Sequence, residues 1–147
     1  PTTTLQPQPN QAAPPQPMVK RSVRRVLIIE DNRDTAVSLK MLLNHMQFEV
    51  DVAFSGPDGL TAAREHSPDV IFCDIGLPGL DGYAVARALR KEEGTRHTFL
   101  IAQSGYGQAE DVRKAHEAGF DMHLIKPVDF NELQRILEVD LTRQLAR

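Results

Sequence analysis

The chain has 147 residues, a net charge of −3 and one cysteine, which suits a single domain with a tail and excludes an internal disulfide framework. Four basic residues precede residue 26, so the remainder carries −7 and nucleic acid is not expected as a direct partner. No apolar run is long enough to cross a membrane, and a lone cysteine is typical of a reducing compartment, so we expect a cytoplasmic protein without direct membrane contact.

Residues 1–24 differ in composition from the rest. Residues 1–17 hold six prolines and four glutamines and almost no large apolar side chain, so they cannot bury enough surface to offset their ordering entropy. We predict a disordered linker at 1–24 and a folded domain at 25–147. This amino-terminal segment favours a folded domain that lies carboxyl-terminal to another domain. A start at Met18 would make the domain free-standing, and the sequence leaves both open.

From residue 25 on, short apolar runs alternate with stretches of helical period. We expect strands at 25–29, 48–54, 69–73, 99–102 and 122–125, and helices at 37–46, 60–66, 85–89, 108–118 and from 129 on. This alternation predicts a parallel sheet with helices on both faces. Asn32 and Asp81 are predicted N-caps, Val37 is expected in the buried stripe of the first helix, and 56–58 is expected as a turn.

Four of the predicted strands end in charged or polar residues. In chain order these are Glu30 with Asp31, Asp74, Ser104 and Lys126. Because the carboxyl ends of parallel strands share one edge of a sheet, we expect these side chains to gather in one acidic pocket. Each alone has a commoner explanation, such as helix capping for the acidic pair or a solvated surface position for the lysine.

Three neighbouring carboxylates repel one another unless a cation lies between them. Oxygen ligands suit a hard ion such as Mg²⁺, Lys126 offers a positive charge for a phosphate, and Ser104 offers a hydroxyl. Glycines, which let backbone amides approach an anion, stand at Gly76, Gly105 and Gly107. The set predicts phosphoryl chemistry on Asp74. The five histidines lack the spacing of a zinc site.

Together these residues resemble the response-regulator receiver domains of two-component phosphorelay signalling, over about residues 25–145. The matching positions are the acidic pair Glu30–Asp31, Asp74 with the loop 77–82, Ser104, and Lys126–Pro127. The resemblance implies an α/β, doubly wound, flavodoxin-like fold with a five-stranded parallel sheet of order 2-1-3-4-5. It also implies a cis bond between Lys126 and Pro127.

The resemblance further implies that Asp74 accepts a phosphoryl group from a histidine kinase or a histidine phosphotransfer protein. The domain would then catalyse its own phosphorylation and dephosphorylation. Mg²⁺ would be bound by Asp31, Asp74 and the Gly76 carbonyl, with Glu30 acting through a water molecule.

Lys126 would neutralise a phosphoryl oxygen, and Ser104 would move onto the phosphoryl group as the conformation switches. The residue that usually turns inward at this switch is Tyr or Phe in the family, and here it is His123. A histidine could make the switch sensitive to pH, although a neutral, packed imidazole is the simpler expectation.

The resemblance extends to receivers attached to hybrid sensor histidine kinases, through the segment 73–90. We therefore expect the carboxyl-terminal receiver of such a kinase. Whether phosphorylation drives dimerisation is left open. The alternative is a pseudo-receiver, an interaction module that works without phosphorylation, and the intact set of acids with Lys126 argues against it.

Overall fold

A computed structural model describes residues 23–105 and 107–140. The linker predicted at 1–24 therefore lies almost wholly outside the described residues. Within the described part the chain forms two units, Val23–Phe130 and the segment 131–140. None of the helices in this part of the chain is long and apolar enough to cross a membrane.

The unit Val23–Phe130 is built on a sheet whose paired strands are all parallel. The strands are β1 (Arg25–Ile29), β2 (Glu49–Ala53), β3 (Val70–Asp74), β4 (Phe99–Ser104) and β5 (Met122–Ile125). Their order in the sheet is β2-β1-β3-β4-β5. The predicted doubly wound fold is confirmed, and each strand lies within two residues of its predicted place.

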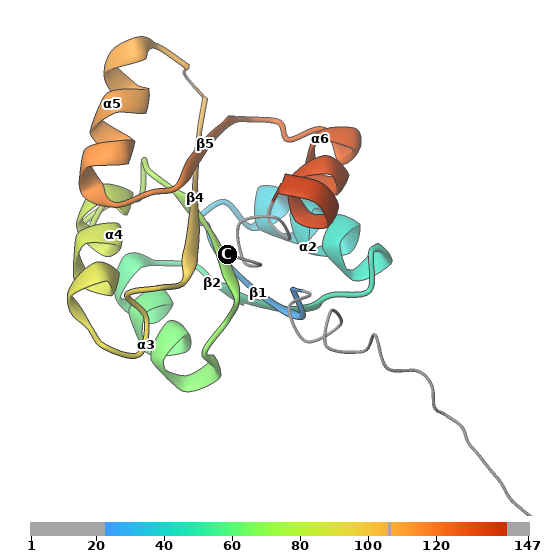
Figure 1. Cartoon of the computed structure of the whole chain (residues 1–147), viewed down its shortest axis with the longest axis horizontal. Coiled ribbons are helices and arrows are strands. Elements are labelled where there is room, and N and C mark those ends of the chain that lie inside the picture. Colours follow the sequence, from blue (N-terminus) through green and yellow to red (C-terminus); the bar gives the residue numbers. More distant parts are fainter. Residues whose placement is uncertain (1–22, 106, 141–147) are drawn as a thin grey trace, which may run out of the picture. The chain divides into compact units, whose positions relative to one another are not determined.

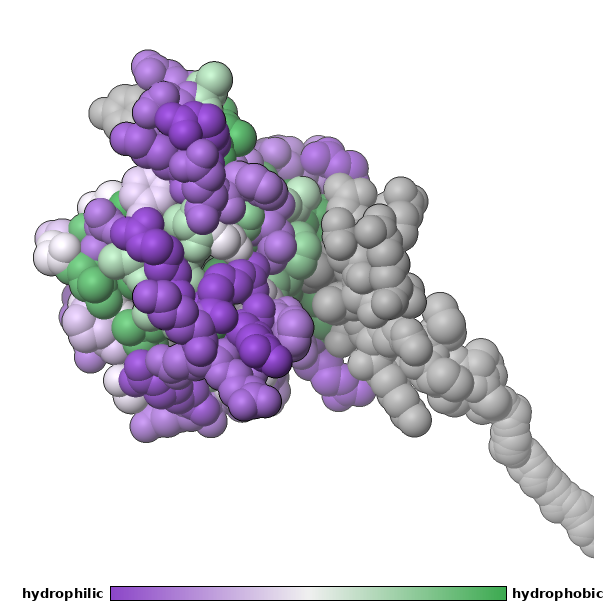
Figure 2. Space-filling view, turned by 60° about the vertical axis from the view of Figure 1, so that its left-hand side comes forward, coloured by the Kyte–Doolittle hydropathy of each residue, from purple (hydrophilic) through white to green (hydrophobic). Residues whose placement is uncertain are grey.

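The helices between the strands cover both faces of this sheet. They are α2 (Arg33–His45), α3 (Gly56–His66), α4 (Gly82–Lys91) and α5 (Ala109–Ala118). Figure 1 shows α2 on one side of the sheet and α3, α4 and α5 on the other. Figure 2 brings the side of α3, α4 and α5 forward, where hydrophilic residues predominate and hydrophobic ones form small separate areas.

The core follows the two-residue period of the strands. On the side of α3, α4 and α5, one buried cluster joins alternate strand residues to small and aliphatic helix residues, among them Leu27, Ile29, Ile71, Val85 and Leu89. The intervening strand residues are equally buried, as Ile28 and Phe72 show. Burial of both faces explains why β1, β3 and β4 are continuous apolar runs rather than alternating ones.

Two expectations about the helices were wrong. The segment 56–58 is the first turn of α3 and not a turn before it, because Ser55 caps the helix by accepting a hydrogen bond from the Asp58 amide and Pro57 stands where a helix tolerates proline. Val37 is 49% exposed. The buried face of α2 is formed by Ala36, Leu39 and Leu43.

Both predicted N-caps are confirmed. The side chain of Asn32 accepts a hydrogen bond from the Thr35 amide at the start of α2, and that of Asp81 accepts one from the Ala84 amide at the start of α4. The last helix, α6 (Phe130–Arg135), begins at the end of this unit and continues in 131–140 as a π-helical segment, Ile136–Asp140.

Candidate active site

The predicted acidic pocket forms at the carboxyl edge of the sheet. Asp74 is the last residue of β3, and Glu30 and Asp31 follow β1 directly. Each of the three offers a carboxylate oxygen, and these oxygens lie within 4.8 Å of one another. The sequence prediction that strand ends bring these acids together is confirmed.

Asp74 is buried, with 8% of its surface exposed, and its position is fixed by the loop that follows it. Its Oδ1 accepts a hydrogen bond from the Gly76 amide, at 3.1 Å. A Cβ atom at Gly82 would lie 2.5 Å from the Cα of Ile75 and 2.6 Å from the carbonyl oxygen of Asp74. Only glycine therefore lets α4 begin so close to the end of β3.

Glu30 and Asp31 are adjacent in sequence but differ in environment. Glu30 is 1% exposed, whereas Asp31 is exposed. Both Glu30 oxygens have donors: Oε1 accepts from Lys126 Nζ at 2.7 Å, and Oε2 accepts from the Asn32 amide at 3.1 Å. Asp31 and Asp74 are thus the better placed to bind a metal directly, and Glu30 suits an indirect role.

Lys126, directly after β5, lies between two of the acids. Its Nζ is 2.7 Å from Glu30 Oε1 and 3.4 Å from Asp74 Oδ1. Burial alone would lower the pKa of Lys126, but the hydrogen bond to Glu30 and the charge of Asp74 outweigh it and raise this pKa. Burial raises the pKa of Glu30, although the Lys126 hydrogen bond opposes it. The lysine is therefore a fixed positive charge. The peptide bond between Lys126 and Pro127 is cis, as predicted.

The charges of this site suit a divalent cation. With all groups ionised, three carboxylates and one ammonium leave a local charge of −2. The ligand atoms are oxygens, and one of the three acids is open to solvent. This donor set fits Mg²⁺, which binds to carboxylates and retains several waters.

Ser104 ends β4 and is 5% exposed. Its Oγ lies 2.9 Å from Nε2 of His123, within hydrogen-bond distance. His123 is on the neighbouring strand β5, opposite Ala102 in the register, so Ser104 and His123 are diagonal neighbours on one face. Burial lowers the pKa of His123, with a smaller opposing effect from the charge of Asp111. The neutral, packed imidazole is the state that this environment favours.

Two features of this region were not expected from the sequence. One is the Ser104–His123 contact, which depends on strand register. The other is Gln103, a 2% exposed amide beside Asp74 in the sheet, whose Oε1 has no hydrogen-bond partner within the described residues. The one indication of this residue in the sequence is that a glutamine directly follows the apolar run 99–102.

Cys73 is buried, which strongly raises its thiol pKa, so it is a core residue rather than a nucleophile.

Comparison with known proteins agrees with this geometry. The model of the response regulator receiver domain matches residues 26–138. The response regulator ArlR of Staphylococcus aureus is 32% identical over 120 residues, which are 82% of this chain and 53% of that protein. The chain thus spans about half the length of the curated relatives it matches.

Solved structures share the fold. A putative response regulator from Chloroflexus aurantiacus superposes with a TM-score of 0.75 at 28% identity, covering 86% of this chain and all of that one. The same values hold for the receiver domain of the sensor histidine kinase PA1611 from Pseudomonas aeruginosa, whose structure has a magnesium ion coordinated in the active-site cleft. By its fold, its strand-end acids and the extent of the family match, the chain belongs to the response regulator receiver domains.

Proposed function

We propose that Asp74 is the phosphoacceptor of a phosphorelay and that its donor is a phosphohistidine on a histidine kinase or a histidine phosphotransfer protein. A carboxylate oxygen of Asp74 attacks phosphorus, the phosphorus–nitrogen bond breaks, and the imidazole leaves with the electron pair. The observation that carries this proposal is the placement of Asp74, which is buried, has a carboxylate oxygen within 4.8 Å of those of Glu30 and Asp31, and lies 3.4 Å from Lys126.

The residues around Asp74 have separate roles in this proposal. Asp31, Asp74 and the Gly76 carbonyl would hold Mg²⁺, and Glu30 would act through a water molecule. When bound, Mg²⁺ would neutralise charge on the phosphoryl oxygens. Lys126 adds a positive charge that needs no reorganisation, because it already lies against the carboxylates. The receiver of PA1611 has a magnesium ion coordinated in its active-site cleft, which supports a magnesium site in this chain.

Ser104 and His123 form the switch in this proposal. In the structure the Ser104 hydroxyl is within hydrogen-bond distance of His123. A hydroxyl that moves onto the phosphoryl group exchanges this contact for a charge-assisted one. His123 is then released to repack, so that phosphorylation shifts the population of two conformations.

The same proposal covers the domain boundaries and the larger protein to which the receiver is attached. Residues 25–147 form the receiver, 1–24 a linker, and the chain is the cytoplasmic, carboxyl-terminal receiver of a hybrid sensor histidine kinase. The Pro- and Gln-rich composition of 1–17 supports an attachment to another domain.

The test is the intact mass after incubation with Mg²⁺ and acetyl phosphate. We expect one added phosphoryl group in the natural protein and in the control Asp58→Asn, and none in Asp74→Asn or without Mg²⁺. An adduct that persists in Asp74→Asn would refute the assignment. If the natural protein gains no adduct from acetyl phosphate or from a phosphorylated histidine phosphotransfer protein, and does not bind Mg²⁺, the pseudo-receiver interpretation replaces it.

A further inference from the structure

A stacked pair of side chains lies beside the acidic site, on the side of β2. Arg33 is the first residue of α2 and follows Asp31 by two positions. Its guanidinium carbon, Cζ, lies over the ring of Phe54, 4.1 Å from the ring centroid, which is a cation–π contact. Phe54 directly follows β2, the strand next to β1. The contact therefore fixes a positive charge where two neighbouring strands end.

The strand register places this pair near the acids. The strands β1 and β2 pair as far as Ala53, whose carbonyl accepts a hydrogen bond from the Glu30 amide at 3.0 Å. Phe54 is thus beside Glu30, at the strand spacing of about 4.8 Å. Charges influence one another over about 10 Å at an ionic strength of about 0.1 M. A guanidinium stacked on this ring, on a residue two positions from Asp31, is therefore close enough for its field to reach the acidic site.

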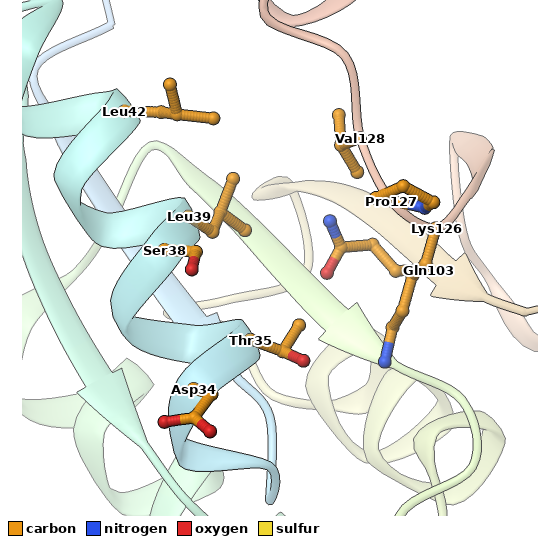
Figure 3. A pocket seen from close by; sticks show the side chains of 9 residues that line it. All are labelled: Asp34, Thr35, Ser38, Leu39, Leu42, Gln103, Lys126, Pro127 and Val128. Carbon is orange, nitrogen blue, oxygen red and sulfur yellow. The ribbon is translucent and has the colours of Figure 1, made fainter.

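Lys126 reaches the acids from another side. Figure 3 shows Lys126 and Thr35 of α2 on two sides of a cavity, which Asp34 also lines. Arg33, which precedes these residues in α2, does not line this cavity. The acids thus have one cation that is already paired with them, Lys126, and a second one, Arg33, that is held apart from them on Phe54.

The position of Arg33 is unfavourable for the stability of α2. A positive side chain in the first turn of a helix is opposed by the helix dipole. Arg33 is exposed, and it forms no ion pair with any residue in the part of the chain that the structure describes. An arginine that stabilises neither the helix nor an ion pair, but is held by an aromatic ring beside an acidic site, is suited to act on that site.

We propose that Arg33 makes the phosphotransfer reaction selective for donors whose phosphoryl group is dianionic, an inference that rests on the proposed function. The three carboxylates, Lys126 and a bound Mg²⁺ together are neutral, so they give a dianion no net long-range attraction. Transfer replaces the monoanionic Asp74 carboxylate by a dianionic acyl phosphate, so the site becomes negative by one charge. The Arg33 guanidinium offsets that charge, and Phe54 is a positioning residue that holds the guanidinium at the edge of the site.

Two phosphodonors that differ in charge test the proposal. At neutral pH acetyl phosphate is a dianion and phosphoramidate is a monoanion. We would measure the initial rate of adduct formation by intact mass with each donor, in the full chain and at saturating Mg²⁺. Arg33→Gln should slow the reaction about fivefold with acetyl phosphate and about twofold with phosphoramidate, because the interaction energy is proportional to the charge of the donor. At an ionic strength of about 0.5 M both differences should shrink.

Three further variants separate the charge of Arg33 from its effect on the fold. Arg33→Lys keeps the charge and should restore most of the rate with acetyl phosphate. Phe54→Leu should lose part of the preference for acetyl phosphate, and nothing more when it is combined with Arg33→Gln, because the ring acts through the guanidinium. Arg96→Gln, the same substitution at an exposed position just before β4 and so at the opposite edge of the sheet, should leave both rates unchanged.

The affinity for Mg²⁺ gives a readout that does not depend on phosphorylation. The same guanidinium repels a divalent cation, so Arg33→Gln should bind Mg²⁺ about fivefold more tightly than the natural protein in a calorimetric titration. An unchanged affinity would overturn the proposal, because the charge of Arg33 would then not reach the site.

Equal slowing of the two donors by Arg33→Gln, or an unchanged rate with acetyl phosphate, would overturn the proposal and leave Asp74 as the phosphoacceptor. A natural protein that reacts with neither small donor would also overturn it, and the proposed function would then depend on the test with a phosphorylated histidine phosphotransfer protein.

Discussion

Asp31 is the exposed member of the acidic cluster, and it illustrates how function opposes stability. Its carboxylate oxygen lies within 4.8 Å of those of Glu30 and Asp74, and the positive charge of Lys126 offsets part of the repulsion. A site that awaits a cation therefore carries unfavourable energy while the cation is absent.

We expect Asp31→Asn to raise the free energy of unfolding without metal by up to about 1 kcal/mol, because it removes one of three like charges. The variant should also lose stabilisation by Mg²⁺, which for the natural protein is about 2.7 kcal/mol at a hundredfold excess over Kd. Urea unfolding with and without Mg²⁺ measures both. Asp58→Asn, outside the cluster, should leave the stabilisation by Mg²⁺ unchanged, and a metal-free Asp31→Asn that is less stable than the natural protein would contradict the argument.

His123 gives the protein a pH dependence of defined sign. Burial lowers its pKa below the ordinary value of 6.5, so the unfolded chain binds the proton more readily than the folded one. The stability that His123 contributes is therefore present above pH 6.5 and is lost as the pH falls through the lowered, folded-state pKa.

We compare the free energy of unfolding of the natural protein with that of His123→Phe. As the pH rises from below the folded-state pKa toward 7, we expect the difference to change in favour of the natural protein. Urea unfolding at a series of pH values measures this difference. His97→Phe, at an exposed position, serves as the control and should follow the natural protein. A constant difference between the natural protein and His123→Phe across this range would show that the imidazole does not titrate differently in the folded state.

The helix α3 packs on β1 through a glycine. A Cβ atom at Gly59 would lie 2.5 to 2.9 Å from three side-chain carbons of Ile29, which is fully buried. Alanine in a helix is normally favoured over glycine by about 1 kcal/mol, but overpacking a rigid core costs about 1 to 3 kcal/mol. Because Ile29 cannot move outward, the second effect should be the larger.

We therefore expect Gly59→Ala to destabilise the protein by about 1 kcal/mol net, in urea unfolding. Adding Ile29→Val removes one of the contacting carbons and should recover part of that loss in a double-mutant cycle. Gly94→Ala, where nothing lies within 4 Å of the added Cβ, should cause no comparable loss. A stabilising Gly59→Ala would mean that α3 can shift on the sheet.

The elements differ in how far the sequence could predict them. β1, β3 and β4 were predictable because a parallel strand buried on both faces reads as an unbroken apolar run, and the acids follow from the ends of those runs. The start of α3 was missed because Gly56 and Pro57 favour a turn as well as a first helical turn. The Ser104–His123 contact required the register of β4 on β5, which no local pattern contains.

A group of polar contacts lies at the edge of the sheet opposite the acidic site. There, Arg90 of α4 donates hydrogen bonds to the carbonyls of Gly119, Arg96 and Thr98 and to the Asp121 carboxylate, at 2.7 to 2.9 Å. Thr98 and Asp121 stand just before β4 and β5. One guanidinium thus connects α4 to the amino ends of β4 and β5. This edge of the sheet is remote from the acidic site, so its charges can serve stability.

We expect Arg90→Met to lower the free energy of unfolding by about 2 to 4 kcal/mol, since it removes this donor from two partly buried carbonyls and one exposed carbonyl and breaks the ion pair with Asp121. Arg90→Lys should recover little, because an ammonium cannot reproduce the planar fork of donors. Arg113→Met is the matched control: its ion pairs with Glu110 and Glu117 lie on the exposed face of α5, so we expect no measurable change. Equal effects of the two substitutions in urea unfolding would show that the count of ion pairs, and not their burial and connectivity, determines the stability of this sheet.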